Sequence, residues 1–204
     1  MVNEEEKRLT EEETEETVPA AVPEENLGKR LWKDYGDMLV ILVAVFVVFK
    51  FIFQLAWVPT GSMETTLPTK SLLLGWHLPY AVADPVPDYG DVITFWSDEL
   101  DEVLVKRVIG LPGDTVTYAD GYVYRNGEKL DESYLPGQGI TYCDDEFSVP
   151  EGYFFVMGDN RGGSYDGRYW AMPYIEIKEV QAKVLLCVSV GKNHAWQGVH
   201  LIGK

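Results

Sequence analysis

A long apolar stretch near the N-terminus constrains this chain more than any other feature. Residues 38–49 read MLVILVAVFVVF without a polar side chain, and after Lys50 the apolar character continues to Val58. A helix rises about 1.5 Å per residue, so residues 38–58 have the length that a hydrocarbon core of about 30 Å requires. A run of this length is too long for one strand of a soluble sheet. We therefore predict a transmembrane helix over residues 38–58.

The charges around this stretch predict its orientation. Lys29, Arg30 and Lys33 lie in a juxtamembrane segment, residues 29–37, whereas uncharged residues follow the stretch. The positive-inside rule then places the N-terminus in the cytoplasm and residues 59–204 on the outer side. The stretch is longer than the apolar region of a cleaved signal peptide, and no Ala-x-Ala site follows it in a suitable position. We expect a retained, single-pass anchor.

The first residues form a separate acidic segment. The chain of 204 residues has a formal net charge of −16, and residues 1–26 hold ten Glu against Lys7 and Arg8. Such a composition cannot bury enough apolar surface to offset the entropy of ordering, so residues 1–28 are expected to be a disordered cytoplasmic tail. The remainder has no basic stripe, which argues against binding to nucleic acid.

Residues 59–204 read as one all-β domain. Turn signals separate the strand-like runs SLLLGW, DVITFW, VLVKRVIG, DTVTYA, GYVYRNG, GYFFVMG and VQAKVLLCVSV. Asp120-Gly121 and Asn126-Gly127 stand between alternating residues and predict hairpins with tight primed turns. Cys143 and Cys187 lack the spacing of metal ligands, and a disulfide and two buried thiols both remain open.

A serine follows the apolar stretch directly. Ser62 lies between Gly61 and Met63 in the segment PTGSM, and Thr60 adds a second hydroxyl. Gly61 lets the backbone approach a substrate closely. Taken alone, however, a Gly-Ser pair is far more often an ordinary turn than a nucleophile.

A nucleophilic serine needs a base. His77, His194 and His200 have no recognisably placed Asp or Asn to orient them, so a Ser-His-Asp arrangement is open but unsupported. Lys106 lies in the apolar run VLVKRVIG, where desolvation and the neighbouring Arg107 would lower its pKa toward about 7–8 and allow it to act as a base. Strand alternation alone favours an outward-facing lysine.

A third segment is polar where a strand would not be. MGDNRGGSYDGRYW lies between the apolar segments GYFFVM and YWAMPY, which suggests that it is held against a core. A dense polar loop in such a place usually supports a site through hydrogen bonds. Its charged and hydroxyl side chains are Asp159, Arg161, Ser164, Asp166 and Arg168.

Together these segments resemble signal peptidase I, the bacterial enzyme that removes signal peptides from exported proteins. PTGSM resembles the family's nucleophile motif, and YGDVITF, VKRVIGLPGDTV and GDNRGGSYDGR resemble three further motifs in the family's order. The resemblance covers nearly all of residues 38–190. It implies β-sheets that form a partly open barrel, related to the self-cleaving Ser/Lys repressor proteases, after the single anchor of the compact members.

The resemblance also implies roles for individual residues. Ser62 would be the nucleophile, Lys106 the general base, Thr60 part of the oxyanion hole and Ser164 the group that positions the lysine amine. A salt-bridged support would consist of Asp159, Arg161, Asp166 and Arg168. Small pockets for the −1 and −3 side chains would be lined by Val58, Pro59, Met63, Leu67 and Val105. The chemistry requires no metal or organic cofactor.

The same resemblance implies the setting. The enzyme would lie in the bacterial cell membrane, in contact with lipid, signal-peptide-bearing preproteins and the secretion translocon. Two positions depart from the family's pattern, Thr65 in place of a usual proline and Gly167 in place of a frequent serine. The alternatives are a catalytically inactive, membrane-tethered β domain, another Ser/Lys membrane protease, and a signal peptidase that uses histidine as its base.

Overall fold

A computed structural model describes residues 27–64, 66–82, 86–135, 140–190 and 196–202 of the chain. The chain divides into two compact units, Met1–Ala44 and Val45–Lys204. Most of the predicted acidic tail, together with Thr65 and His194, lies outside the described residues.

The predicted apolar helix is present, with different ends. Helix α2 spans Leu27–Ile52, so it includes the juxtamembrane segment and stops before Val58. Its portion Gly28–Ile52 is long and apolar enough to cross a membrane. The predicted end at residue 58 is wrong because the chain turns at Ile52 into strand β1, Phe53–Trp57. The backbone of β1 pairs with β2, a tertiary contact that hydropathy does not reveal.

The second unit is built around one antiparallel sheet of eight strands. Their order is β1-β2-β11-β3-β4-β9-β10, and β12 pairs with β11. Among the described strands β1 and β10 end this order, so the sheet is open and is not a closed barrel. After β1 the strands are β2 (Ser71–Trp76), β3 (Val92–Ser97), β4 (Glu102–Gly110), β9 (Tyr153–Met157), β10 (Tyr174–Glu176), β11 (Val180–Val190) and β12 (Trp196–Leu201).

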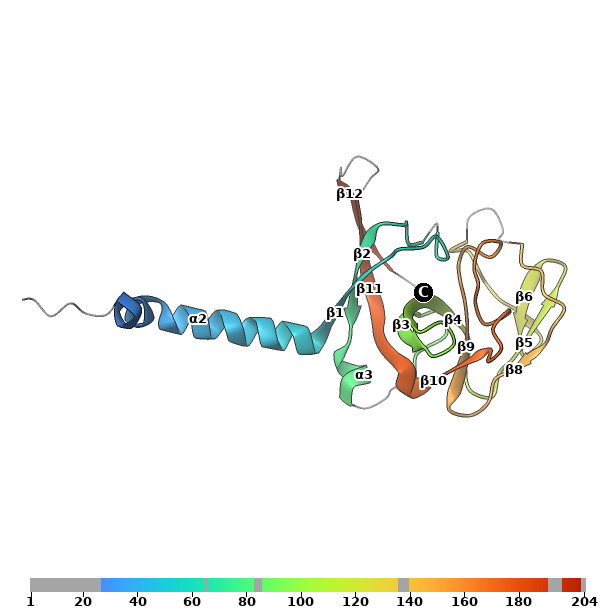
Figure 1. Ribbon diagram of the computed structural model, residues 1–204. Helices are drawn as coiled ribbons and strands as arrows, with labels where there is room; N and C mark the ends of the chain where they lie inside the picture. Colours follow the sequence, from blue (N-terminus) through green and yellow to red (C-terminus); the bar gives the residue numbers. More distant parts are fainter. Residues whose placement is uncertain (1–26, 65, 83–85, 136–139, 191–195, 203–204) are drawn as a thin grey trace, which may run out of the picture. The chain divides into compact units, whose positions relative to one another are not determined.

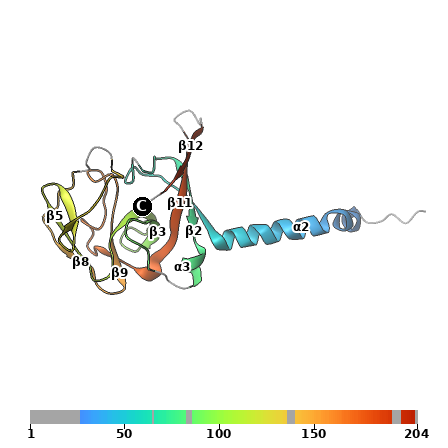
Figure 2. The ribbon, with the colours of Figure 1, turned by 180° about the vertical axis from the view of Figure 1, so that it is seen from behind.

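A smaller sheet forms the other end of this unit, away from β2 and β12 (Figures 1 and 2). Its order is β7-β6-β5-β8, and its strands are β5 (Thr115–Ala119), β6 (Tyr122–Arg125), β7 (Glu128–Lys129) and β8 (Phe147–Ser148). Asp120-Gly121 and Asn126-Gly127 all have positive φ, as a primed turn requires, which confirms both predicted hairpins. Short helical turns at α3 (Leu78–Val82) and η1 (Ile177–Glu179) complete the unit.

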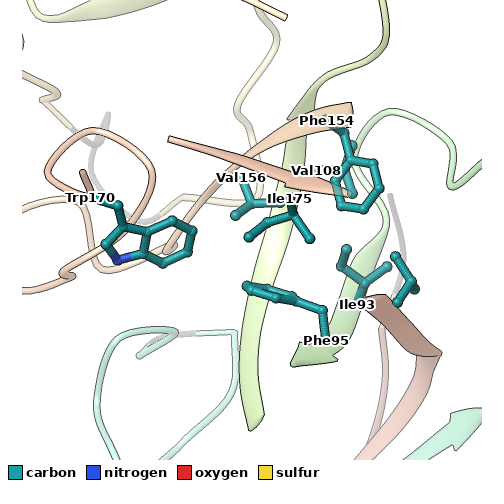
Figure 3. Close-up of a cluster of buried hydrophobic side chains, with 8 residues drawn as sticks. Ile93, Phe95, Val108, Phe154, Val156, Trp170 and Ile175 are labelled. Atoms are coloured by element: carbon teal, nitrogen blue, oxygen red, sulfur yellow. The ribbon is translucent and has the colours of Figure 1, made fainter. Parts of the chain in front are cut away.

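Apolar side chains from distant strands form the core. Figure 3 shows one cluster in which Phe95, Val108, Phe154 and Trp170 meet. A second cluster lies under the turn that follows β1 and contains Val58, Met63, Leu67, Leu73, Val92, Val184 and Cys187. Cys187 is buried and Cys143 is partly exposed, and both are free thiols.

The two antiparallel sheets that follow helix α2 make the chain mostly β after one N-terminal helix, as predicted.

Candidate active site

The turn that carries Ser62 is pinned from both sides. Before it, the backbone N–H of Val58 donates to the carbonyl of Ser71 at 3.0 Å, which keeps the strand end on β2. After it, the N–H of Leu67 donates to the carbonyl of Met63 at 2.8 Å. The side chains of Val58, Met63 and Leu67 are buried in the core cluster below. Burial of these apolar anchors leaves Ser62 on the surface side of a fixed turn.

Ser62 borders a groove of about 280 Å³. One wall is residues 54–57 of β1, and the other is residues 102–105 of β4. Thr60 also lines the groove, as do four of the five predicted pocket residues, namely Val58, Pro59, Met63 and Val105. The fifth, Leu67, packs beneath the groove with Val58 and Met63.

Lys106 is a buried cation on β4. Its exposed fraction is 2%, so the outward-facing orientation that strand alternation favours does not occur. Its Nζ lies 3.2 Å from the Oγ of Ser164. Desolvation lowers the pKa of Lys106 to about 8, against the opposing effect of the Asp166 carboxylate.

The expectation that Arg107 helps to lower this pKa needs correction. Successive side chains of a strand point to opposite faces, and the guanidinium of Arg107 is bound to Asp159 and to the carbonyl of Gly90. The cation that contributes most to lowering the pKa of Lys106 is Arg168. Asp166 pairs with Arg168, so its effect on the pKa of Lys106 is partly offset, and burial remains the largest cause of the lowered pKa.

Gly158 brings the serine turn and the polar loop together. A Cβ on this residue would lie 2.2 Å from the Oγ of Ser164 and 2.4 Å from the carbonyl oxygen of Ser62, so only glycine allows this approach. The neighbouring Asn160 donates its backbone N–H to the carbonyl of Ser62 at 3.1 Å and its side-chain amide to that of Gly61 at 3.0 Å. The turn, Ser164 and Lys106 are thereby joined in one site.

The predicted salt-bridged support consists of separate ion pairs. Asp159 accepts two hydrogen bonds from Arg107, at 2.9 and 2.7 Å, and one from the hydroxyl of Thr66 at 2.5 Å. Asp166 pairs with Arg168 at 2.8 and 2.9 Å and accepts the backbone N–H of Gly158 at 2.8 Å. Asp159 thus holds the loop to Arg107 of β4, whereas Asp166 ties two parts of the loop to each other.

Arg161 reaches a different partner. It pairs with Glu132 at 2.5 Å, and its guanidinium donates to Thr141, to Tyr134 and to the carbonyl of Gly158. It therefore links the loop to the segment between β7 and β8 of the small sheet. Sequence analysis missed Arg107, Glu132 and Asn160 as parts of this support, although Arg107 carried a signal as a second charge within an apolar strand.

The histidines lie elsewhere. His77 places Nδ1 2.5 Å from the carbonyl oxygen of Gln181 and lines a different pocket from Ser62. His200 lies on β12, opposite Cys187 of β11. Neither of these two described histidines lines the groove of Ser62, whereas Lys106 is linked to the serine turn through Ser164 and Gly158.

Comparison with known proteins adds independent information. The family model described as signal peptidase, peptidase S26, matches residues 32–189. "Probable signal peptidase I-2" of Synechocystis sp. is 32% identical over 153 residues, which cover 72% of this chain and 69% of that protein. Signal peptidase I of Pseudomonas fluorescens is 31% identical over 198 residues, which cover 77% of this chain and 70% of that protein.

Among solved structures, a signal peptidase I from Enterococcus faecalis V583 matches with 34% identity and a TM-score of 0.43. The match covers 48% of this chain and 97% of that one. The family match extends from within α2 to Ser189 in β11 and includes the serine turn, Lys106 and the polar loop. The chain belongs to the signal peptidase family, peptidase S26, and is a serine endopeptidase of the signal peptidase I type.

Proposed function

We propose that Ser62 is the nucleophile and Lys106 the general base of this signal peptidase I. The observation that carries the proposal is the burial of Lys106, whose pKa of about 8 leaves about a tenth of the amine neutral at pH 7, far more than in an exposed lysine. A neutral amine that is linked to the serine turn through Ser164 and Gly158 can accept a proton, whereas His77 lines the adjoining pocket and His200 lies on β12.

The reaction proceeds by two acyl transfers. Neutral Lys106 takes the proton of the Ser62 hydroxyl as Oγ attacks the scissile carbonyl carbon. The tetrahedral intermediate then breaks the C–N bond, and the Lys106 ammonium returns the proton to the leaving amine. In the second half, neutral Lys106 takes a proton from water as the water oxygen attacks the ester carbonyl carbon. The bond between this carbon and Ser62 Oγ then breaks, the Lys106 ammonium returns the proton to Oγ, and the carboxyl product leaves.

Thr60 and Ser164 assist this chemistry. Thr60 lines the groove beside Ser62, and its hydroxyl together with the Ser62 N–H forms the oxyanion hole of the proposal. One donor of this kind contributes roughly 2.7–4 kcal/mol to transition-state stabilisation. Ser164 lies 3.2 Å from Lys106 and holds its amine toward the serine turn. Asp159, Arg161, Asp166 and Arg168 keep the loop in place through the contacts described above.

The substrate binds as an extended strand between two edges. Four consecutive residues of β1 and four of β4 line the groove, and since side chains alternate along a strand, both walls are strand edges. β1 ends its sheet, and β9 pairs with β4 only from Arg107 onward. A peptide strand can therefore pair with both walls and place small −1 and −3 side chains against Val58 and Val105.

The protein is membrane-anchored, and the details of its placement are part of the proposal. Helix α2 crosses the membrane once, with Lys29, Arg30 and Lys33 on the cytoplasmic side and the sheets on the outer side. The register of β1, β2, β11 and β12 places several exposed apolar side chains on the same face of the sheet. They are Leu55, Trp57, Leu72, Trp76, Val199 and Leu201. An apolar face of this kind suits contact with lipid.

Signal peptidase I acts on preproteins that bear signal peptides, and such substrates reach the membrane through the secretion translocon. We therefore place the enzyme near the translocon, with its groove at the level where a preprotein emerges. Anchoring on the same membrane raises the effective concentration of the substrate without any new contact.

Cleavage of a preprotein in detergent tests the proposal. The wild type should release a mature product whose new N-terminus, read by sequencing, follows a small residue. Ser62→Ala and Lys106→Met should abolish this product, while His200→Ala should retain it. Full cleavage by Lys106→Met would refute the assignment of the base, and loss of cleavage in His200→Ala with an intact fold would favour histidine.

A further inference from the structure

An apolar pocket continues the groove of Ser62 past Gln54. Its volume is about 700 Å³, and it shares Gln54 and Leu55 of β1 with the groove. The remaining lining residues are Phe46, Phe49, Lys50, Phe53, His77 and Gln181. All of them lie in the unit Val45–Lys204, to which the last turns of α2 belong.

Contacts within this unit hold the pocket in shape. The rings of Phe49 and Phe53 are 5.0 Å apart, and the N–H of His77 donates to the carbonyl of Ile52 at 2.8 Å. At the junction with the groove, the amide of Gln54 donates to Gln181 at 2.7 Å and accepts the Thr94 hydroxyl at 2.5 Å. The passage from the groove into the pocket is therefore formed before any substrate binds.

The direction of the substrate follows from the groove. Gln54, Val58 and Ser62 line the groove in this order along the chain, so Val58, the proposed −1 contact, precedes Ser62 and Gln54 lies further upstream on β1. A paired strand advances about 3.3 Å per residue, as β1 does, so the substrate residue beside Gln54 is about four positions upstream of the one beside Val58. Residues upstream of about −5 then enter the apolar pocket.

We propose that this pocket binds the apolar segment of the signal peptide and makes Phe46 and Phe49 specificity-determining residues. The inference rests on the proposed function of the groove. A signal peptide carries an apolar region directly before its small-residue cleavage site, which matches a largely apolar pocket that directly follows the pockets for small side chains. A lipid acyl chain is an alternative occupant that would also fit the apolar lining. Binding of lipid, however, would not explain why the pocket adjoins the groove of Ser62.

The test compares two substrates with the same cleavage site. One is a full preprotein, and the other is a short peptide that begins at about −5 and so lacks the apolar segment. In the full chain in detergent, Phe46→Ser and Phe49→Ser should each lower the ratio of kcat/KM for the long substrate to kcat/KM for the short one by about tenfold, because a buried apolar contact is lost.

Phe51→Ser is the matched control. Phe51 lies on the same helix and is 65% exposed, close to the 66% of Phe46, but it does not line the pocket. The ratio should not change in this variant. An unchanged ratio in Phe46→Ser and Phe49→Ser, or an equal fall in Phe51→Ser, would overturn the inference. Cleavage of both substrates by Ser62→Ala would instead overturn the proposed nucleophile and leave the ratio test intact.

A photo-crosslinking amino acid at position 49 distinguishes the two occupants. In vesicles of phosphatidylglycerol and phosphatidylethanolamine, the preprotein should crosslink through its apolar segment. A crosslink to lipid alone, undiminished by added preprotein, would show that an acyl chain fills the pocket and would contradict the inference.

Discussion

The amine of Lys106 lies 3.2 Å from the hydroxyl of Ser164, and both side chains are buried beside the turn that carries Ser62. This pairing gives a desolvated lysine one polar neighbour that can orient it. In the proposed mechanism the neutral amine must face the serine hydroxyl, so Ser164 acts as a positioning residue.

Ser164→Ala should lower kcat by about tenfold and leave KM close to that of the wild type, because one hydrogen bond to the base is lost while the groove is unchanged. Ser164→Thr should restore most of the activity. Steady-state kinetics on a preprotein measure both values. Ser189→Ala, at another buried serine, serves as the control, and a matching loss there would indicate a general effect on the fold.

Lys106→Met should inactivate the enzyme and stabilise it. The folded lysine has a pKa of about 8 against 10.5 in the unfolded chain, so the unfolded state binds more protons between these values. Burial of the amine therefore costs stability fully below pH 8, by about 3 kcal/mol, and the cost disappears as pH rises to about 10.5. Thermal unfolding in detergent should show that Lys106→Met is more stable than the wild type at pH 7 and that this difference in stability is smaller at pH 10. A variant less stable than the wild type at pH 7 would contradict this.

Gly158→Ala should reduce activity strongly, because the new methyl group would meet Ser164 Oγ and the carbonyl oxygen of Ser62. We expect kcat/KM to fall by about a hundredfold, since small displacements at a reacting centre have effects of this size. Gly162→Ala in the same loop is the control, because a Cβ there would have no atom within 4 Å. Equal activity of the two variants would disprove the close approach.

Asp159→Asn should destabilise the fold by about 3–5 kcal/mol, because it leaves the buried guanidinium of Arg107 without its anion. The measurement is the thermal midpoint in detergent. Lys178→Ala removes one partner of the exposed pair with Glu176 and should not shift the midpoint measurably. If both variants shifted it alike, burial of the Arg107–Asp159 pair would not be the cause.

Local sequence patterns were sufficient to predict the mostly-β fold class and most of the strands. The alternation of residues 115–125 and the Asp120-Gly121 turn specify a hairpin without help from the rest of the chain. The end of α2 was not predictable in this way, because Phe53–Trp57 continues the apolar stretch with only Gln54 as a polar residue. Only pairing with β2, which is a tertiary contact, makes this segment a strand.

For the site, too, some residues could be predicted from the sequence, whereas others depend on tertiary contacts. Ser62 gains meaning from its position after the apolar stretch, which is visible in the sequence. Lys106 and Arg107 are adjacent cations, and the pattern of β4 does not reveal which of them faces Ser164 and which faces Asp159. The partner of Arg161 is Glu132, from a segment outside the polar loop, so no motif within the loop could identify it.

Covalent labelling tests the central assignment most directly. The full chain is incubated at pH 7 with an acylating serine-protease inhibitor, and its proteolytic peptides are analysed by mass spectrometry. In the wild type the acyl group should be found on the peptide that contains Ser62, and in Lys106→Met this adduct should be absent. An adduct on another residue, or an equal yield on Ser62 without Lys106, would contradict the Ser62–Lys106 mechanism.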